Sequence, residues 1–322
     1  MPQKRVSMAM VAQRAGVSGQ TVSRVANDSP RVDPATRARV EQAMAELGYR
    51  PNRAARALRT GRSHTIGLVA QTLATIGNSR MLQAVAESAA SRGYAVTVVT
   101  LGADGGIDDA FDRLRDQGVD GAIVLNEATA LARHAASAGL RLVVVDSLPD
   151  QRFTVIGTDH AAGARTATEH LLAAGHRTVH HLAGPADSYA AAERERGWRE
   201  ALGDAGAPEP ELVRGDWSAA SGYARIGELA DATALFVAND QMALGALRAL
   251  ADAGRRVPED VAVIGFDDIA DAAEFQPPLT TVRQDFDALG EQAVRRLVDW
   301  IDGARPDDLL LSPALVTRRS AP

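Results

Sequence analysis

Polar side chains that can bind hydroxyl groups recur in the larger, C-terminal part of the chain, mostly where runs of Val, Ile, Leu and Phe end. Parallel strands bring such ends to one edge of a sheet, so these side chains are expected to meet in a cleft. A carboxylate or a guanidinium can bind two neighbouring hydroxyls, and an indole ring can cover the C–H face of a pyranose. The sequence therefore predicts a sugar-binding cleft whose candidate residues are Asp146, Arg194, Trp217, Asn239, Asp267 and Gln284.

Some of these residue types also have a structural interpretation, because Asp and Asn after a strand often cap the next helix. Asp240 is expected to act in this way at the start of a helix over Asp240–Ala253. For any single cleft residue, the residue type alone leaves ligand binding and helix capping equally open.

An enzyme active site is the rival interpretation of the cleft. Asp267 and Asp268 are adjacent, so their side chains point apart at a strand exit and make a poor acid–base pair. His176, His180 and His181 could suggest a metal, but no acidic or Cys partner lies at ligand spacing. The chain also lacks the glycine patterns of phosphate-binding loops and a nucleophile elbow. We therefore expect no catalytic site, no metal and no cofactor.

A second set of chemistry-bearing residues lies near the N-terminus, in V-A-Q-R-A-G-V-S-G-Q-T-V-S-R-V-A-N over residues 11–27. Apolar residues at helical spacing predict two short helices whose buried faces meet, which leaves the polar residues of the second helix on its outer face. Gln can read adenine, Arg can read guanine, and hydroxyl groups can bind phosphate. The candidate DNA-reading residues on this face are Gly19, Gln20, Thr21, Ser23 and Arg24.

Capping residues set the boundaries of this expected helix-turn-helix. Ser7 and Ser18 can begin the two helices, and Gly16 supplies the positive φ that the turn between them needs. A third helix is predicted over Pro34–Leu47, with Asp33 as its cap. Any helical hairpin with one polar face would fit the same pattern, so the assignment to DNA binding depends on charge.

The charge distribution is strongly uneven along the chain. Residues 1–62 hold 12 Lys and Arg against 4 Asp and Glu, a net charge of +8, whereas the whole chain has a net charge of −6. A basic N-terminal part joined to an acidic body is typical of a module that binds a polyanion. This distribution favours double-stranded DNA as the partner of the N-terminal helices.

The stretch P-N-R-A-A-R-A-L-R-T-G at 51–61 follows the three helices. It is shorter than the ~12–15 residues that an isolated helix needs in water, and Leu58 is its one large apolar residue. We expect a hinge helix that forms only on DNA, with Arg53, Arg56 and Arg59 toward phosphates and Leu58 as a wedge in the minor groove. A basic linker is the alternative interpretation.

From His64 onward, short Val-, Ile- and Leu-rich runs alternate with helical patterns. Strands are predicted over Thr65–Ala70, Ala95–Thr100, Gly121–Leu125, Leu142–Val145, Thr178–Ala183, Ala234–Val237 and Val261–Gly265. Helices are predicted over Ser79–Arg92, Ile107–Gln117, Ala130–Ala138, Ala161–Ala174, Tyr189–Ala205, Ser218–Leu229, Asp240–Ala253 and Phe286–Trp300. This alternation predicts parallel sheets covered on both faces, and its two series predict an α/β core of two doubly wound lobes with a cleft between them.

The composition excludes several classes of protein. Hydrophobic residues make up 46% and charged residues 24% of the chain, as in ordinary globular proteins. No apolar run reaches the length of a membrane span, and Lys4 and Arg5 are not followed by the apolar core of a signal peptide. Cys is absent, which excludes disulfides and agrees with a cytoplasmic location.

Five contiguous stretches resemble the LacI/GalR family of transcriptional regulators. They are A-G-V-S-G-Q-T-V-S-R-V at 15–25, A-M-A-E-L-G-Y-R-P-N-R at 43–53, G-D-W-S-A-A-S-G at 215–222, V-A-N-D-Q-M-A-L-G-A at 237–246 and P-P-L-T-T-V-R-Q-D-F at 277–286. The resemblance runs from about Val6 to Arg319 and implies a dimeric repressor with a core similar to periplasmic binding proteins.

The resemblance also implies roles for individual residues on operator DNA. Gln20 and Arg24 would contact base edges, and the hinge helix with Asn52, Arg53 and Leu58 would enter the minor groove. The residues implied to contact or position the DNA backbone are Ser18, Thr21, Ser23, Asn27 and Thr36.

The implied domains are a helix-turn-helix domain at 1–50, a hinge helix at 51–62 and an effector-binding and dimerisation core at 63–322. Within the core, lobe 1 would comprise residues about 63–158 and 286–311, and lobe 2 residues about 159–285 and 312–319. No leucine-heptad tail follows V-T-R-R at 316–319, so a homodimer is expected rather than a tetramer.

All six cleft residues have the types found in lactose-responsive members of the family, which implies a hexose or galactoside effector that releases the operator. The alternative is a regulator of the same fold that answers to another sugar, a sugar phosphate or a purine, including as a corepressor. Gly19 departs from the Tyr of those members, so the operator sequence should differ. The expected lobe 1 wall also departs from them, at Gln71, Thr75, Gly77 and Met81.

Overall fold

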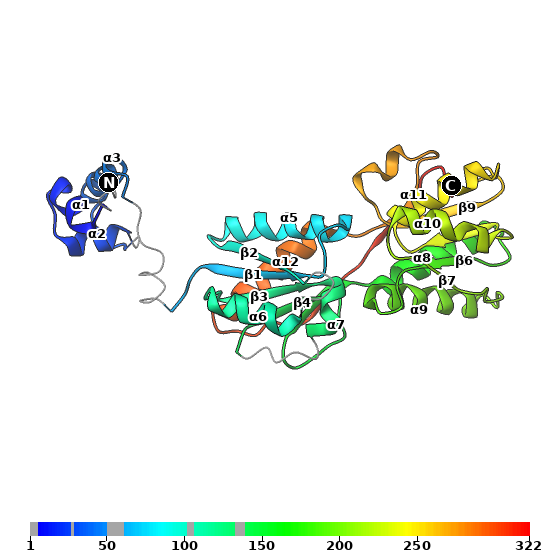
Figure 1. Ribbon diagram of the computed structural model, residues 1–322, viewed down its shortest axis with the longest axis horizontal. Coiled ribbons are helices and arrows are strands. Elements are labelled where there is room, and N and C mark those ends of the chain that lie inside the picture. Colours follow the sequence, from blue (N-terminus) through cyan, green and yellow to red (C-terminus); the bar gives the residue numbers. More distant parts are fainter. Residues whose placement is uncertain (1–5, 27–28, 50–60, 102–105, 133–138) are drawn as a thin grey trace. The chain divides into compact units, whose positions relative to one another are not determined.

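The computed structural model describes residues 6–26, 29–49, 61–101, 106–132 and 139–322, and the chain divides into two compact units, Met1–Ser63 and His64–Pro322 (Figure 1). No helix among the described residues is long and apolar enough to cross a membrane.

The N-terminal unit contains the three predicted helices, α1 (Met8–Ala15), α2 (Gly19–Ala26) and α3 (Pro34–Leu47). Their shared core is built on Val11, Val22 and Val40, which are fully buried. The predicted caps are confirmed at Ser7, whose side chain accepts from the Met10 N–H, and at Asp33, whose side chain accepts from the Thr36 N–H. Residues 50–60, which hold most of the expected hinge helix, lie outside the described residues.

Gly16 makes the turn between α1 and α2 as predicted. Its φ of 65° lies in the left-handed region, where a residue with a Cβ is strained. Its N–H bonds to carbonyls of the last turn of α1, and the Val17 N–H donates to the Ala12 carbonyl at 3.0 Å. The chain thus reverses within one turn and begins α2 directly.

Lobe 1 of the second unit is built on a fully parallel sheet covered on both faces (Figure 1). Across the sheet its strands are β11 (Leu309–Leu311), β5 (Thr154–Thr158), β4 (Leu142–Val145), β3 (Gly121–Leu125), β1 (Thr65–Ala70) and β2 (Ala95–Thr100). One face is covered by α5 (Ile76–Ser91) and α12 (Phe286–Ile301), and the other by α6 (Ile107–Asp116) and α7 (Thr129–Ala132).

Lobe 2 repeats this arrangement with one difference at its edge. Across its sheet the strands are β12 (Ala314–Val316), β10 (Thr280–Arg283), β9 (Ala262–Asp267), β8 (Ala234–Val237), β6 (His180–Ala183) and β7 (Val213–Arg214). One face is covered by α8 (His160–Ala173) and α9 (Tyr189–Asp204), and the other by α10 (Ala219–Arg225) and α11 (Asp240–Asp252). The edge strand β12 is antiparallel to β10, whereas the other pairs are parallel.

The expected fold class is confirmed, and the differences are local. The sequence did not predict β5, β7, β11 or β12, which are short or contain Gly157. A Cβ at Gly157 would lie 2.6 Å from Asp146 Oδ1, so the glycine that hides β5 in the sequence lets the Asp146 side chain approach this strand. The helix predicted over Ala130–Ala138 is described only as α7, since residues 133–138 lie outside the described residues.

The chain passes between the two lobes at three places: from β5 to α8, from β10 to α12, and from β11 to β12. The first two passages leave from the carboxyl ends of parallel strands, where open α/β sheets bind their ligands. Asp146 and Gln284 therefore lie where the lobes meet, at the ends of β4 and β10.

Candidate functional site

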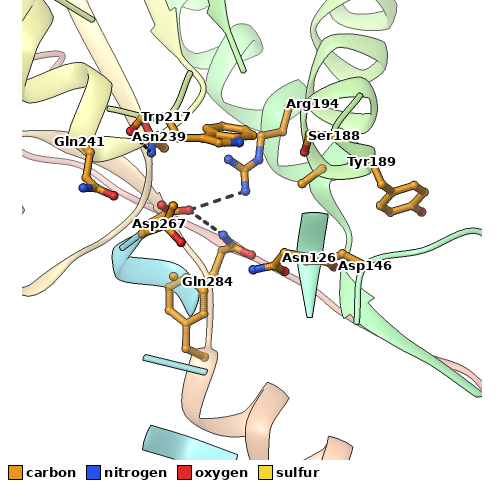
Figure 2. A pocket seen from close by; sticks show the side chains of 14 residues that line it. Asn126, Asp146, Ser188, Tyr189, Arg194, Trp217, Asn239, Gln241, Asp267 and Gln284 are labelled. Carbon is orange, nitrogen blue, oxygen red and sulfur yellow. Dashed lines mark hydrogen bonds and ion pairs between the residues drawn. The ribbon is translucent and has the colours of Figure 1, made fainter. Parts of the chain in front are cut away.

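A cavity of about 570 Å³, open to solvent, lies between the two lobes of the second unit (Figure 2). All six predicted cleft residues line it. Its lining consists of Thr75, Gly77, Asn126, Asp146, Ser188, Tyr189, Ala190, Arg194, Trp217, Asn239, Gln241, Asp267, Gln284 and Phe286.

Unusual backbone conformations are concentrated around this cavity. Among the described residues, six that are not glycine have a positive φ, and four of them line the cavity: Asn126, Asp146, Trp217 and Asp267. Such conformations cost free energy and persist where the surroundings hold them, which makes them common at binding sites. The unusual backbone conformations therefore indicate a binding site at the same cavity as the polar side chains do.

Arg194, on α9, is the buried centre of the cavity wall and only 4% exposed (Figure 2). Its guanidinium donates to the Ala238 carbonyl, lies 3.6 Å from Asp267 Oδ1, and stacks 3.9 Å from the centre of the Phe266 ring. These contacts hold the plane of the guanidinium in place at the cavity wall.

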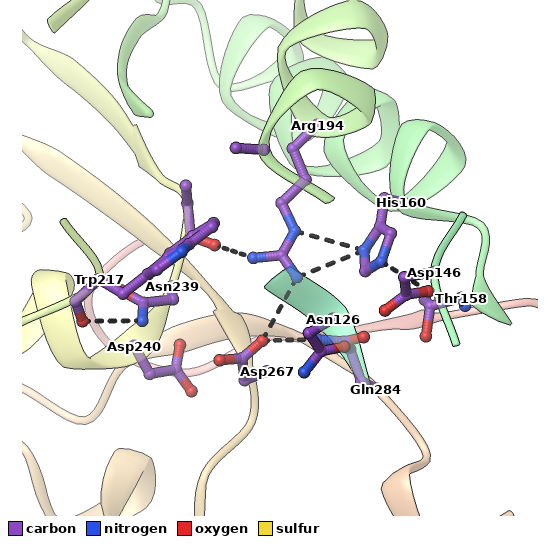
Figure 3. Close-up of polar contacts among 12 residues, drawn as sticks. Asn126, Asp146, Thr158, His160, Arg194, Trp217, Asn239, Asp240, Asp267 and Gln284 are labelled. Carbon is purple, nitrogen blue, oxygen red and sulfur yellow. Dashed lines mark hydrogen bonds and ion pairs between the residues drawn. The ribbon is translucent and has the colours of Figure 1, made fainter. Parts of the chain in front are cut away.

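His160, the first residue of α8, links Arg194 to Asp146 (Figure 3). Its Nδ1 accepts from Arg194 Nε at 3.4 Å, which leaves the ring proton on Nε2 because a guanidinium can only donate. Nε2 lies 3.1 Å from Asp146 Oδ1, an electrostatic contact without aligned hydrogen-bond geometry. The Thr158 N–H, at the end of β5, donates to the same oxygen at 3.1 Å. Asp146 is thereby fixed with its second oxygen left for a ligand.

Asp267 ends β9, and its carboxylate accepts a hydrogen bond from Gln284 Nε2 at 2.6 Å (Figure 2). Burial raises the pKa of Asp267, while the Arg194 charge and the Gln284 hydrogen bond oppose this rise. Burial and repulsion from Asp267 raise the pKa of the neighbouring Asp240 well above its ordinary value. One carboxyl group of the cavity lining, Asp267, therefore lies close to a second carboxyl group, Asp240, that is buried behind the lining.

The helix cap expected from Asp240 is supplied by Asn239, which also lines the cavity. Asn239 caps α11, since its Oδ1 accepts from the Met242 N–H at 2.9 Å. Asp240 is fully buried and accepts instead from Thr281 Oγ1 at 2.6 Å and from the Ile269 N–H at 2.9 Å. The prediction that Asp240 caps this helix is therefore wrong, because its side chain turns inward to join β10 and the residues after β9.

Trp217 supplies the flat apolar wall of the cavity. Asn239 Nδ2 donates to its backbone carbonyl at 3.1 Å, and its ring lies 5.5 Å from the Arg194 guanidinium. A Cβ on Gly184 would lie 2.3 Å from the indole, so this glycine lets the ring lie flat on the backbone after β6. The indole is thus held by its backbone, by Gly184 and by the Arg194 guanidinium.

Several lining residues were missed by the sequence analysis. Asn126 directly follows β3, so the rule that identified the other strand ends could have found it. Gln241 lines the cavity from α11, and its Oε1 accepts from the Ile76 N–H of lobe 1 at 3.3 Å. Ser188 and Tyr189 come from the start of α9, where no sequence signal marked them; burial raises the pKa of Tyr189 to about 12.

The sequence also singled out the expected lobe 1 wall and Asp268, and only part of this set lines the cavity. Of the expected lobe 1 wall, Thr75 and Gly77 line the cavity, whereas Met81 packs in the lobe 1 core and Gln71 is not in the lining. Asp268 turns away from Asp267 and pairs with Arg283 and Arg318, each at 2.7 Å.

The histidines weighed as a metal site serve the structure of lobe 2. His181 is fully buried, stacks on the Phe236 ring, and donates from Nδ1 to the Phe236 carbonyl at 2.9 Å. Burial lowers its pKa to about 3, so it is neutral at physiological pH. Among the described residues, no group of three or more His, Asp or Glu could hold a metal ion.

The predicted DNA-reading residues form one surface of α2, here called the reading surface: Gly19, Gln20, Thr21, Ser23 and Arg24. Gly19, Gln20 and Arg24 are exposed, and Thr21 and Ser23 are half-buried. Ser18 accepts from the Thr21 N–H at 3.1 Å and so begins the helix, as predicted.

Four other residues implied to contact DNA, Asn27, Asn52, Arg53 and Leu58, lie outside the described residues. Thr36 is half-buried near the start of α3, and its Oγ1 accepts from Arg39 at 3.1 Å.

Each of the two units contains a match to the description of a known protein family. The description "Bacterial regulatory proteins, lacI family" matches residues 7–52, and "Periplasmic binding protein-like domain" matches residues 168–321. The lactose operon repressor of Escherichia coli K12 is 39% identical over 329 residues, covering 98% of this chain and 91% of the relative. The chain belongs to the LacI family. This LacI-family chain is therefore a DNA-binding transcriptional regulator, and the expected resemblance is confirmed.

Solved structures of LacI-family proteins are similar over the full chain. The lac repressor dimer bound to operator and the anti-inducer ONPF has a TM-score of 0.89, at 39% identity over 99% of each chain. The complex of the regulator CelR of Thermobifida fusca with cellobiose has a TM-score of 0.74, at 37% identity over 98% of this chain and 100% of the other.

Proposed function

We propose that this LacI-family chain is a dimeric repressor of sugar-utilisation genes that a neutral sugar, a hexose or galactoside, releases from its operator. The reading surface of α2 contacts the operator, and the cavity between the lobes binds the sugar. One observation carries the choice of ligand. The cavity is lined both by the Trp217 indole and by carboxylates, and its guanidinium, that of Arg194, already pairs with the Asp267 carboxylate.

Charge favours a neutral ligand over a phosphorylated one. The charged side chains in the lining are Asp146, Asp267 and Arg194, so carboxylates outnumber the cation. The Arg194 charge is already opposed by Asp267. A phosphate would need further donors with positive charge, whereas sugar hydroxyls can donate to carboxylates and accept from Arg194.

The cleft is proposed to bind its ligand without converting it. Asp267 and Asp268 diverge to different partners, Gln284 for the first and Arg283 and Arg318 for the second. Two carboxyl groups that face apart cannot share a substrate as acid and base. The function therefore needs no cofactor, and the place of action is the cytoplasm, where operator DNA lies.

Association of two copies through the core is part of the proposal. The lac repressor that is similar to this chain is a dimer on its operator. In this chain, Tyr223 on α10 and Leu244 on α11 are large apolar residues that are 42% and 45% exposed, and Val98 on the edge strand β2 is 39% exposed. These residues are candidates for the contact between two copies.

Calorimetry with a panel of ligands tests the proposal. Galactosides, pentoses, nucleobases and a sugar phosphate are titrated into the full chain, and each binder is then added to the chain bound to promoter DNA. We expect a neutral sugar to bind and to release DNA. Binding of a nucleobase or sugar phosphate that tightens DNA binding would establish the corepressor alternative instead.

A further inference from the structure

Two asparagines form a relay behind the lobe 1 wall of the cavity. Asn126 lines the cavity after β3, and its Nδ2 donates to Asn78 Oδ1. Asn78, on α5, is fully buried and does not line the cavity. Its own Nδ2 donates to the Thr72 carbonyl at 2.9 Å. A buried amide of this kind is retained only when its polar groups are satisfied.

The relay fixes the orientation of both amides. A backbone carbonyl can only accept, so Asn78 must turn Nδ2 toward Thr72 and Oδ1 toward Asn126. Asn126 must then donate, which turns its own Oδ1 away from Asn78. Within the described part of the chain, this oxygen has no protein partner and is not buried from solvent. The end of the relay is therefore an acceptor available to the cavity.

The backbone of Asn126 agrees with a fixed side chain. Its φ of 43° is in the left-handed region, which Asn tolerates better than most residues. The Thr75 side chain also accepts from the Asn78 N–H at 3.4 Å and so begins α5 at this point. On the lobe 1 side of the cavity, the oriented amide of Asn126 thus lies in a lining that also contains the small residues Thr75 and Gly77.

We propose that Asn78 is a positioning residue that fixes the Asn126 amide so that the cleft presents an oxygen to a donating hydroxyl of the sugar. This inference rests on the proposed function for the class of ligand. Asn126 contacts the sugar, and Asn78 acts only through Asn126. The pair makes lobe 1 selective for a hydroxyl over a hydrogen or a fluorine at one ring position, because neither of those can donate.

The test uses methyl β-D-galactopyranoside and, for each of its four hydroxyl groups, a pair of analogues in which that hydroxyl is replaced by hydrogen or by fluorine. Each sugar is titrated into the full chain. In the native chain, one analogue pair should bind roughly three- to tenfold more weakly than the parent sugar, as expected for one lost hydrogen bond. Asn78→Leu, which has the same branched arrangement of heavy atoms, should abolish this one discrimination and leave the others unchanged. Gln83→Leu, an exposed change on the same helix, should alter none of them.

A double-mutant cycle separates positioning from general support. If Asn78 acts through Asn126, then Asn78→Leu should weaken sugar binding in the native background and have no effect in Asn126→Ala. Additive losses would overturn the proposal, as would an unchanged discrimination pattern in Asn78→Leu. Asn78→Asp is a second variant that keeps the positioning role testable if Asn78→Leu misfolds. With its introduced carboxyl group protonated, the side chain could make both hydrogen bonds of Asn78, whereas the ionised form could not donate to the Thr72 carbonyl. The sugar affinity of this variant, relative to the native chain, should therefore be normal at low pH and fall as pH rises.

A ligand-free measurement separates failure of this inference from failure of the proposed function. The side-chain NH₂ signals of Asn126, assigned by their loss in Asn126→Ala, should shift in Asn78→Leu and not in Gln83→Leu. If no galactoside binds but these signals shift, the proposed ligand class is wrong and the relay stands. If they do not shift, the relay is refuted whatever the ligand.

Discussion

The reading surface of α2 and the cleft of the second unit hold their polar side chains in opposite ways. The side chains of Gln20 and Arg24 are exposed and make no hydrogen bond to any other described residue. Arg194, Asp146 and Asp267 are each less than a tenth exposed and are bonded to one another or to the backbone.

This difference follows from the size of the ligand that each surface is proposed to bind. DNA is large and polyanionic, so exposed donors on a firm helix can meet it without being buried beforehand. A sugar offers only a few hydroxyls, and its binding gains from groups that are already oriented and partly dehydrated. Substitutions in the cleft should therefore disturb folding and binding together, whereas those on α2 should disturb binding alone.

Arg194→Ala should have the largest effect, because it leaves the buried Asp267 carboxylate without its cation. Sugar affinity should fall about 10- to 150-fold, from the ~1.5–3 kcal/mol of hydrogen bonding to a charged group that is lost. The free energy of unfolding should fall by ~3 kcal/mol, the cost of breaking a buried pair. The matched control is Arg196→Ala on the same helix, whose exposed pairs with Glu193 and Glu200 are worth ~0.2–1 kcal/mol. Calorimetry and thermal unfolding check both. If Arg194→Ala and Arg196→Ala had equal effects, the claim that buried cleft residues contribute more than exposed ones would be contradicted.

Arg24→Ala should weaken operator binding by about 1–3 kcal/mol and relax base preference at one position, as expected for a base-edge contact. Its thermal unfolding and its sugar affinity should not change. Gln42→Ala, an exposed change on α3, is the control. Binding to a library of operator variants measures the preference. A uniform loss on every sequence would instead make Arg24 a phosphate contact.

Acid should weaken sugar binding and leave the reading surface unaffected. Burial raises the pKa of Asp267, so protonation starts at a higher pH than for an ordinary Asp and removes an acceptor from the cleft. As pH falls through that pKa, sugar affinity should drop by up to about tenfold per pH unit, the limit for one linked proton. Asp267→Asn should bind weakly at every pH. A native affinity that is flat between pH 7 and pH 4 would contradict this role.

Asp240→Asn should have the smallest effect, and it should be stabilising. Since the pKa of Asp240 is raised in the folded chain, its favourable contribution is full below the unfolded pKa and is lost as pH rises through the folded value. An amide keeps partners for Thr281 and Ile269 and removes the repulsion from Asp267. At pH 8 we expect a Tm about 2–4 °C higher, or ~1 kcal/mol, with a smaller gain at pH 5.

The control for this prediction is Asp252→Asn, an exposed change near the end of the same helix. It should show no gain that grows with pH. A lower Tm for Asp240→Asn at every pH would mean that the charge of Asp240 stabilises the cleft.

The parts that sequence reasoning predicted are those set by local rules. Caps such as Ser7 and Asp33, the turn at Gly16 and the apolar strands all depend on near neighbours. Four of the six cleft residues, Asp146, Asn239, Asp267 and Gln284, were predicted because strand ends share an edge. Arg194 and Trp217 were predicted from what a guanidinium and an indole can bind, and the ligand role of all six stays a prediction. His160 was missed because its part depends on Arg194, 34 residues away, and on a strand that Gly157 disguises.

Side-chain direction was the least predictable feature. Asn239 and Asp240 are adjacent and both suit a cap, and only tertiary packing decides which one turns inward. Likewise, nothing in the sequence near Asn126 indicates that Asn78, 48 residues away, sets its amide. Contacts of this range depend on how the sheet is assembled, which residue types do not record.

The central claim is that the cleft and the reading surface are coupled through one chain. The most direct test measures the affinity for operator DNA with and without saturating sugar, and the affinity for that sugar with and without operator, at one salt concentration. Thermodynamic linkage requires the same factor in both directions, and we expect about 5- to 150-fold. Sugar affinity that is unchanged by the operator, in a chain that binds both, would contradict the account.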